Sequence, residues 1–99
     1  MKVVYTEDAL RDLGMIADWL ILHYPTVAPV VERRVRTVVA RIARWPQSSR
    51  LAAGRPGVRV APLGRYPYKI FYRVTGDTVE ILHIHHAARQ SLDDPDSRV

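Results

Sequence analysis

Apolar and polar side chains alternate most clearly in the last third of the chain. One side of this stretch carries Tyr68, Ile70, Tyr72 and Val74, and the other carries Lys69, Phe71 and Arg73. This period of two predicts a β-strand, and Thr-Gly-Asp-Thr at 75–78 is typical of a tight turn. The strand that follows, over residues 79–86, has apolar residues at both parities, so at least one of its faces should be covered. Residues 65–89 are therefore expected to form a β-hairpin.

Two amphipathic helices are expected ahead of this hairpin. A β-branched run at residues 2–5 predicts a first strand, and Thr6 suits the N-cap of a helix that stops before Pro25. The predicted core-facing residues of this helix are Ala9, Leu10, Leu13, Ile16, Ala17, Leu20, Ile21 and Tyr24. Thr26 is the expected N-cap of a second helix that ends at Pro46, with an apolar side of Val27, Val31, Val35, Val38, Val39, Ile42 and Trp45. A loop-like connector over 47–57 then leads to a strand over 58–63.

The order of elements is thus strand, helix, helix and three strands, which predicts an α+β fold. We expect the N-terminal strand and a helical hairpin to pack on a small antiparallel sheet. The 99 residues suffice for one domain, placed at 1–90, and the polar tail at 91–99 is expected to be flexible. No run of about 18 apolar residues and no export signal is present, so no membrane association is expected and the cytoplasm is the predicted location.

A second apolar stripe follows the polar side of the first helix. Met15, Trp19 and Leu22 are spaced by four and three residues, which aligns them on one helical face. Because Trp and Met are enriched at interface anchors, the stripe is interpreted as a docking surface for a partner helix or strand. The alternative is scattered surface apolar residues or burial under a tail.

Positive charge is concentrated in the middle of the chain. The formal net charge is +5, and residues 27–65 contain nine arginines but only one acidic residue, Glu32. This distribution indicates an acidic partner, either nucleic acid or an acidic protein segment. An inert basic surface is the alternative.

Several side chains of the predicted strands are candidates for contacting phosphate. Lys69 and Arg73 share a strand face with Phe71 between them, which is a basic patch with an aromatic residue. The alternative is that these long cations only cover a half-exposed sheet. A histidine base working with arginines on a phosphodiester is also chemically reasonable.

No metal site or cofactor is predicted. His83 and His85 share a face at a spacing that can chelate a metal ion, but Glu80, the carboxylate near them, is expected on the opposite face. The chain contains no cysteine, which excludes disulfides and thiolate ligands.

A series of short motifs resembles the RelE/ParE superfamily of bacterial toxins from toxin-antitoxin pairs. The motifs are YTEDALRDL at 5–13, PGVR at 56–59, PYKIFYRV at 67–74, VEIL at 79–82 and HAAR at 86–89. The resemblance covers residues 1 to about 90. The YKIFYR strand and the ending with His86 and Arg89 are similar to the ParE branch.

The resemblance implies two competing activities. ParE-like members inhibit DNA gyrase by binding, and the corresponding target contacts here would be Arg59, Lys69, Arg73, His86 and Arg89. RelE-like members cut mRNA on the ribosome, and a ribonuclease built on this chain would use Arg59, Lys69, Arg73 and His86 without a metal. Ribonuclease members tend to have an arginine near the position of Lys69 and a Tyr or His-Tyr near the chain end, and this sequence departs from both. The non-catalytic activity is therefore favoured, and direct nucleic-acid binding is secondary. A non-toxic interaction module is a third hypothesis.

The resemblance also implies a partner, a ParD-like antitoxin with a helix along the helical hairpin. Its predicted contacts are Met15, Trp19, Leu22, Arg33, Arg34 and Arg41.

Overall fold

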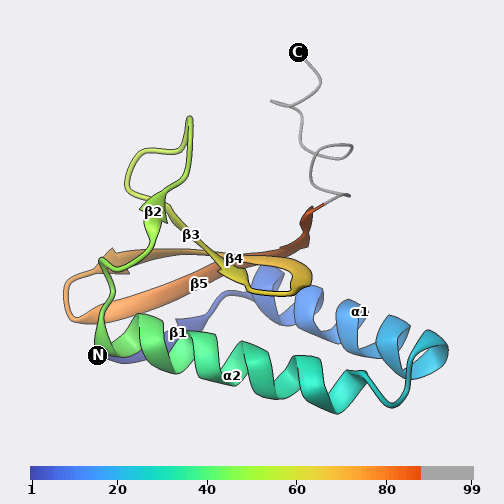
Figure 1. The fold of residues 1–99 in the computed structure, drawn as a ribbon. Coiled ribbons are helices and arrows are strands. Elements are labelled where there is room, and N and C mark those ends of the chain that lie inside the picture. Colours follow the sequence, from blue (N-terminus) through green and yellow to red (C-terminus); the bar gives the residue numbers. More distant parts are fainter. Residues whose placement is uncertain (88–99) are drawn as a thin grey trace.

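The computed structural model describes residues 1–87, which form two helices and five strands (Figure 1). The elements in chain order are β1 Lys2–Tyr5, α1 Glu7–His23, α2 Ala28–Arg44, β2 Arg50–Leu51, β3 Arg59–Leu63, β4 Tyr66–Thr75 and β5 Thr78–His86. The turn between β4 and β5 contains Gly76 at a φ of 62°, a left-handed conformation that favours glycine. The predicted hairpin is therefore present. None of the helices in residues 1–87 is long and apolar enough to cross a membrane.

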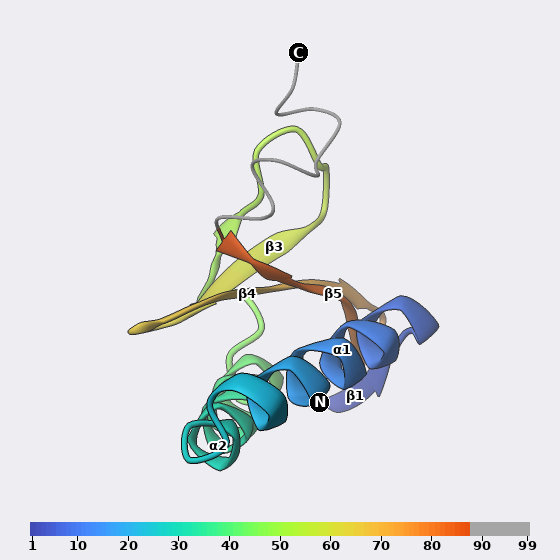
Figure 2. The ribbon, with the colours of Figure 1, turned by 90° about the vertical axis from the view of Figure 1, so that its right-hand side faces the viewer.

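The strands form one sheet in the order β1-β5-β4-β3-β2, and both helices cover the same face of it (Figures 1 and 2). The α+β fold class with a helical hairpin on a small sheet is confirmed. Four of the strands pair antiparallel, whereas β1 lies parallel to β5, with Lys2 opposite Thr78. The sheet is therefore mixed, and the first strand of the chain adjoins the last.

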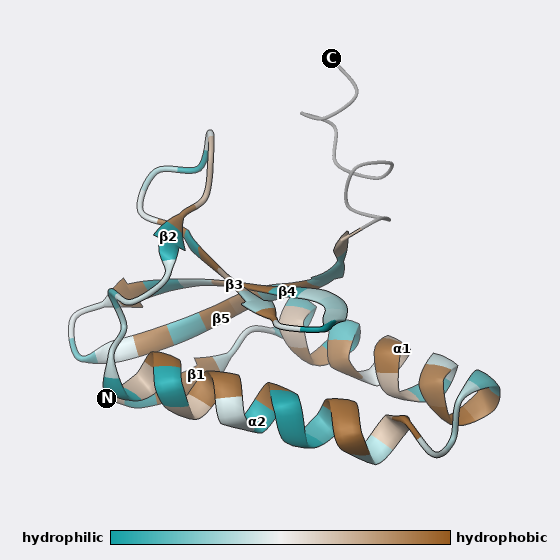
Figure 3. Cartoon of the chain, in the orientation of Figure 1, coloured by the Kyte–Doolittle hydropathy of each residue, from teal (hydrophilic) through white to brown (hydrophobic). Residues whose placement is uncertain are grey.

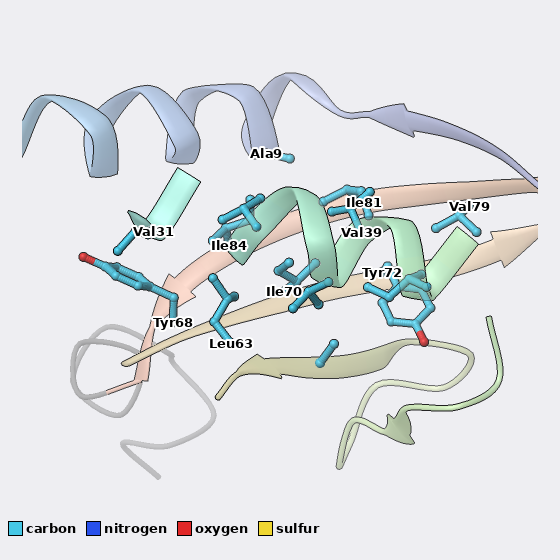
Figure 4. Packing of buried hydrophobic residues seen from close by; sticks show 14 of the residues in the cluster. Ala9, Val31, Val39, Leu63, Tyr68, Ile70, Tyr72, Val79, Ile81 and Ile84 are labelled. Carbon is cyan, nitrogen blue, oxygen red and sulfur yellow. The ribbon is translucent and has the colours of Figure 1, made fainter. Parts of the chain in front are cut away.

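The main core lies between the sheet and the two helices (Figure 4). From the sheet it receives Leu63, Tyr68, Ile70, Tyr72, Val79, Ile81 and Ile84, and from α2 it receives Val31, Val35, Val38, Val39 and Ile42. The apolar side predicted for α2 is buried along most of its length, but Trp45 at its end is exposed. Tyr72 is fully buried, and its hydroxyl donates a hydrogen bond to the Pro46 carbonyl at 2.8 Å.

The apolar side predicted for α1 was too wide. Ala9 and Leu20 are buried and Leu13 and Ile16 pack partly against the core, but Ala17 is exposed. Leu10, Ile21 and Tyr24 are also more than half exposed. The physical reason is the position of α1, which packs along β5 near the side of the sheet where the short strand β1 ends (Figure 2). Only a narrow stripe of the helix meets the core there.

Two local predictions in the connecting segments were wrong. Thr26 does not cap α2. The N-cap residue is Val27, one position later, and no side chain caps this end of the helix with a hydrogen bond. The connector between α2 and β3 contains the short strand β2, whose Leu51 pairs with Arg59.

Thr6 joins the start of α1 to β5. Its side-chain oxygen accepts a hydrogen bond from the Ala9 N–H at 3.1 Å, as the predicted N-cap requires, and lies 3.1 and 3.0 Å from the carbonyl oxygens of Ile81 and Leu82. We expect Thr6→Ala to lower the free energy of unfolding by about 1 to 2 kcal/mol, measured by urea denaturation. Thr6→Ser, which keeps the hydroxyl, should lose much less, and equal losses in the two variants would contradict this role.

Candidate functional site

The face of the sheet opposite the helices, called the outer face here, carries most of the charged strand residues. The register assigns to it Val60, Lys69, Phe71, Arg73, Glu80, His83 and His85. Lys69 pairs with His85 and Phe71 pairs with His83, so that cationic and imidazole side chains stand beside each other on the two central strands.

The aromatic residue of the predicted basic patch is covered. Phe71 is only 3% exposed and packs with Val58 and Val60 in a second, smaller core on the outer face. The guanidinium of Arg55, from the β2–β3 loop, lies 5.3 Å from the centre of the Phe71 ring. The loop rises from this side of the sheet (Figure 1). Phe71 is therefore not a free stacking platform between Lys69 and Arg73.

A β-bulge in β5 changes which side chains share the outer face. Tyr72 pairs with Ile81 and Phe71 pairs with His83, which leaves Leu82 as the extra residue. Glu80 and His83 consequently lie on the same face. The prediction that Glu80 points away from the histidines was wrong, because it assumed unbroken alternation along the strand.

Glu80 is partnered by Arg73 rather than by the histidines. The Nε–H of Arg73 donates to Glu80 Oε1 at 2.7 Å, and the Thr75 hydroxyl donates to the same oxygen at 3.0 Å. The hydrogen bond from Arg73, followed by the one from Thr75, lowers the pKa of Glu80 below its ordinary value. Part of the positive charge predicted for this surface is thus neutralised within the protein.

The histidines instead meet a carboxylate from α1. Asp12 Oδ2 accepts a hydrogen bond from the backbone N–H of Ile84 at 3.0 Å and lies 4.0 Å from His83 Nδ1. The His83 and His85 rings are 5.1 Å apart between centroids. Asp12, His83 and His85 form one cluster at the β5 edge.

The predicted target-binding residues do not all share one face. Lys69 and Arg73 lie on the outer face, whereas Arg59 pairs with Tyr72 and His86 pairs with Tyr68, whose side chains are in the main core. Arg59 donates from Nη1 to the Ser49 carbonyl at 2.7 Å, and His86 meets the Tyr68 ring edge-on, with centroids 5.3 Å apart. Arg89 lies outside the described residues.

The apolar ridge of α1, formed by Met15, Trp19 and Leu22, is exposed in the monomer. Trp19 is 48% exposed and Leu22 is 77% exposed. The Trp19 ring also contacts His23 and Tyr24, at centroid distances of 4.6 and 5.6 Å. With Leu10, Ile21 and Tyr24 exposed as well, α1 presents much more apolar surface than the predicted stripe (Figure 3).

The arginines predicted to contact an antitoxin are exposed on α2. Arg33, Arg34 and Arg41 all have exposed side chains, and the Arg34 guanidinium lies 6.0 Å from the centre of the Tyr66 ring. The neighbouring Arg36 is already paired with Glu32. The helical layer therefore offers an apolar surface on α1 and a positively charged one on α2.

A comparison with protein families matches residues 3–91 to the ParE toxin of the type II toxin-antitoxin system parDE. The chain belongs to the ParE toxin family. It is 37% identical over 89 residues to "Toxin RelE2" of Caulobacter vibrioides, an alignment that spans 89% of this chain and 97% of that protein. ParE family members are toxins of type II toxin-antitoxin systems, so this chain is a toxin of the RelE/ParE superfamily.

Solved structures of the superfamily have the same fold as this ParE family chain. The chromosomal ParDE system of P. aeruginosa contains a chain that superposes with a TM-score of 0.76 at 27% identity, covering 87% of this chain and 95% of that one. The toxin-antitoxin complex RelBE2 of Mycobacterium tuberculosis contains another, with a TM-score of 0.58 at 26% identity, covering 86% and 95%.

Asp12 was not predicted as a site residue of this ParE family chain. It lies among the polar residues of α1 and is 71 positions away from His83, so no local spacing connects the two. One feature of the sequence could have identified it. Asp12 lies next to Leu13 and Ile16, which belong to the core-facing stripe of α1, and this places it at the rim of the contact between the helix and the sheet.

Proposed function

We propose that this ParE family toxin inhibits DNA gyrase by binding, in the cytoplasm, and that a ParD-like antitoxin neutralises it. In this proposal the outer face, with Lys69 and Arg73, contacts the target. The apolar ridge of α1 and the α2 arginines contact the antitoxin. The target and the antitoxin are thus assigned to different side chains of the toxin.

The observation that favours binding over catalysis is the distribution of the candidate catalytic residues. A metal-independent ribonuclease needs a base and cations within hydrogen-bonding reach of one phosphate. Here Arg59 and His86 lie on the helix side of the sheet, whereas Lys69 and Arg73 lie on the outer face. In addition, Arg59 already donates a hydrogen bond to the Ser49 carbonyl, and Arg73 already donates one to the Glu80 carboxylate. These four residues do not converge on a common point.

The antitoxin part of the proposal is supported by the exposed surface of α1. Burying Trp19 and Leu22 under an amphipathic segment would remove apolar area from water, which is the main source of affinity when a helix docks on an apolar surface. Arg33, Arg34 and Arg41 would attract an acidic segment and set its direction. The similar chain of known structure in P. aeruginosa comes from a system named ParDE.

The test is a gyrase supercoiling assay with the purified chain, run beside a ribosome-bound mRNA cleavage assay. We expect inhibited supercoiling and intact mRNA. Lys69→Ala should weaken the inhibition, because it removes a charge from the outer face. Arg11→Ala removes an exposed positive charge from α1, on the helix side of the sheet (Figure 1), and is the control that should leave inhibition unchanged. Cleaved mRNA with unaffected gyrase would overturn the proposal.

Ribosome-dependent cleavage of mRNA is the second candidate. One observation favours it, namely that His83 and His85 stand on the outer face with Lys69, next to Asp12. An imidazole oriented by a carboxylate can serve as a general base. The mRNA cleavage assay described above decides between the two activities.

A further inference from the structure

The cluster of Asp12, His83 and His85 has the composition and dimensions of a metal site. One ligand atom from each residue lies within 4.8 Å of the other two. We propose that these three residues bind a divalent transition metal ion of the Zn²⁺ type. This goes beyond the proposed gyrase inhibition, which uses neither a metal ion nor Asp12, and beyond the ribonuclease candidate, which uses no metal ion.

The distances are close to those that a metal ion would impose. Zn²⁺ binds imidazole nitrogen and carboxylate oxygen at about 2.0 to 2.2 Å in tetrahedral sites, so its ligands lie roughly 3.3 Å apart. Asp12 Oδ2 and His83 Nδ1 are already 4.0 Å apart. Binding would therefore require the three ligand atoms, which lie within 4.8 Å of one another, to approach by about 1 Å through rotation of side-chain bonds.

The main chain holds the ligands in this arrangement. The Ile84 N–H bonds to Asp12 Oδ2 at 3.0 Å, which orients the carboxylate in the way that outer-shell partners orient metal ligands. A carboxylate has further lone pairs, so this hydrogen bond leaves it able to bind an ion. The bulge at Leu82 sends both His83 and His85 to the outer face. The strand β5 and the helix α1 thus fix all three residues.

The donor set favours transition metals over Mg²⁺ and Ca²⁺. Two imidazoles and one carboxylate suit Zn²⁺, Ni²⁺ or Co²⁺, whereas Mg²⁺ and Ca²⁺ prefer oxygen ligands alone. The side chains of His83 and Asp12 are 29% and 26% exposed, so an ion can enter while most of its surroundings are protein. Three protein ligands leave a fourth position for water.

A bound ion would connect α1 to the part of β5 that β1 does not reach. The pairing of β1 ends at Tyr5 and Ile81, and the next contacts across this edge come from Thr6 and Asp12. A metal ion would add a bond between the helix that carries the apolar ridge and the central hairpin. Binding should therefore stabilise the folded chain.

The experiment is titration of the full, untagged 99-residue chain with Zn²⁺ by calorimetry and with Co²⁺ by visible absorption. We expect one ion per chain and the intense absorption bands of tetrahedral Co²⁺. Free Zn²⁺ at roughly 100 times its Kd should raise Tm by about 10 °C. Mg²⁺ should have no comparable effect.

Two substitutions and one control identify the ligands. His83→Gln and His85→Gln should each weaken Zn²⁺ binding by more than the roughly 10- to 100-fold that loss of an outer-shell partner costs. His23→Gln, at the far end of α1, should bind like the parent chain. If either variant fails to fold, Asp12→Asn retains an acceptor for the Ile84 N–H and should still weaken binding. The proposal is overturned if no saturable binding occurs, or if these variants bind as tightly as the His23→Gln control.

Discussion

Trp19→Ala should raise the Kd of the antitoxin complex by at least about 30-fold, which corresponds to roughly 2 kcal/mol. Trp19 is the largest side chain of the apolar ridge and lies between Met15 and Leu22. Large aromatic anchors that become desolvated at the centre of an interface account for most of the binding free energy. The Kd would be measured by calorimetry or surface plasmon resonance with the ParD-like antitoxin of the proposal.

Trp45→Ala is the matched control for this prediction. Trp45 is the only other tryptophan of the chain, it is exposed to a similar extent, and its ring is covered on one side by the Arg44 guanidinium at 4.8 Å. It follows α2 and is not part of the ridge. Equal losses of antitoxin affinity in the two variants would contradict the assigned antitoxin surface. Trp19→Ala should also leave gyrase inhibition unchanged, because Trp19 is not part of the outer face.

Ile70→Ala should lower the free energy of unfolding by about 2 to 5 kcal/mol. Ile70 is fully buried at the centre of β4, between Ile84 on β5 and Ala61 on β3 (Figure 4). Truncation removes buried methyl groups and leaves a cavity under α2 that the sheet cannot close. A domain of this size is stable by about 5 to 15 kcal/mol, so the loss is a large fraction of the total.

Urea denaturation followed by circular dichroism measures this effect, and Val74→Ala is its control. Val74 projects from the same strand to the same side of the sheet, but it is 38% exposed whereas Ile70 is 0% exposed. We expect the control to lose less than about 1 kcal/mol. Similar losses at both positions would show that the centre of the sheet is not packed as described.

Much of the fold follows from local patterns. The alternation in β4, the turn at 75–78 and the Thr6 cap are each specified by residues next to one another, and each was predicted where the structure has it. The apolar side of α2 was also predicted nearly completely, because this helix lies over the middle of the sheet and buries a wide stripe.

The errors arose where distant parts of the chain decide the outcome. The width of the buried stripe on α1 depends on its place near the sheet edge, which the helix sequence does not encode. The face of Glu80 depends on a bulge that is visible only once β4 and β5 are paired. The approach of Asp12 to His83 depends on the parallel pairing of β1, because this pairing sets where α1 starts relative to β5.

The pairing of β1 with β5 also constrains how the chain folds. Lys2 is synthesised well before its partner Thr78, which lies 76 residues later in the sequence. Contacts between segments so far apart in sequence form slowly, because a long loop must close before they are gained. A growing chain therefore keeps β1 without its neighbour until β5 has been synthesised, so this edge of the sheet can form only after both helices and strands β2 to β4 have been made.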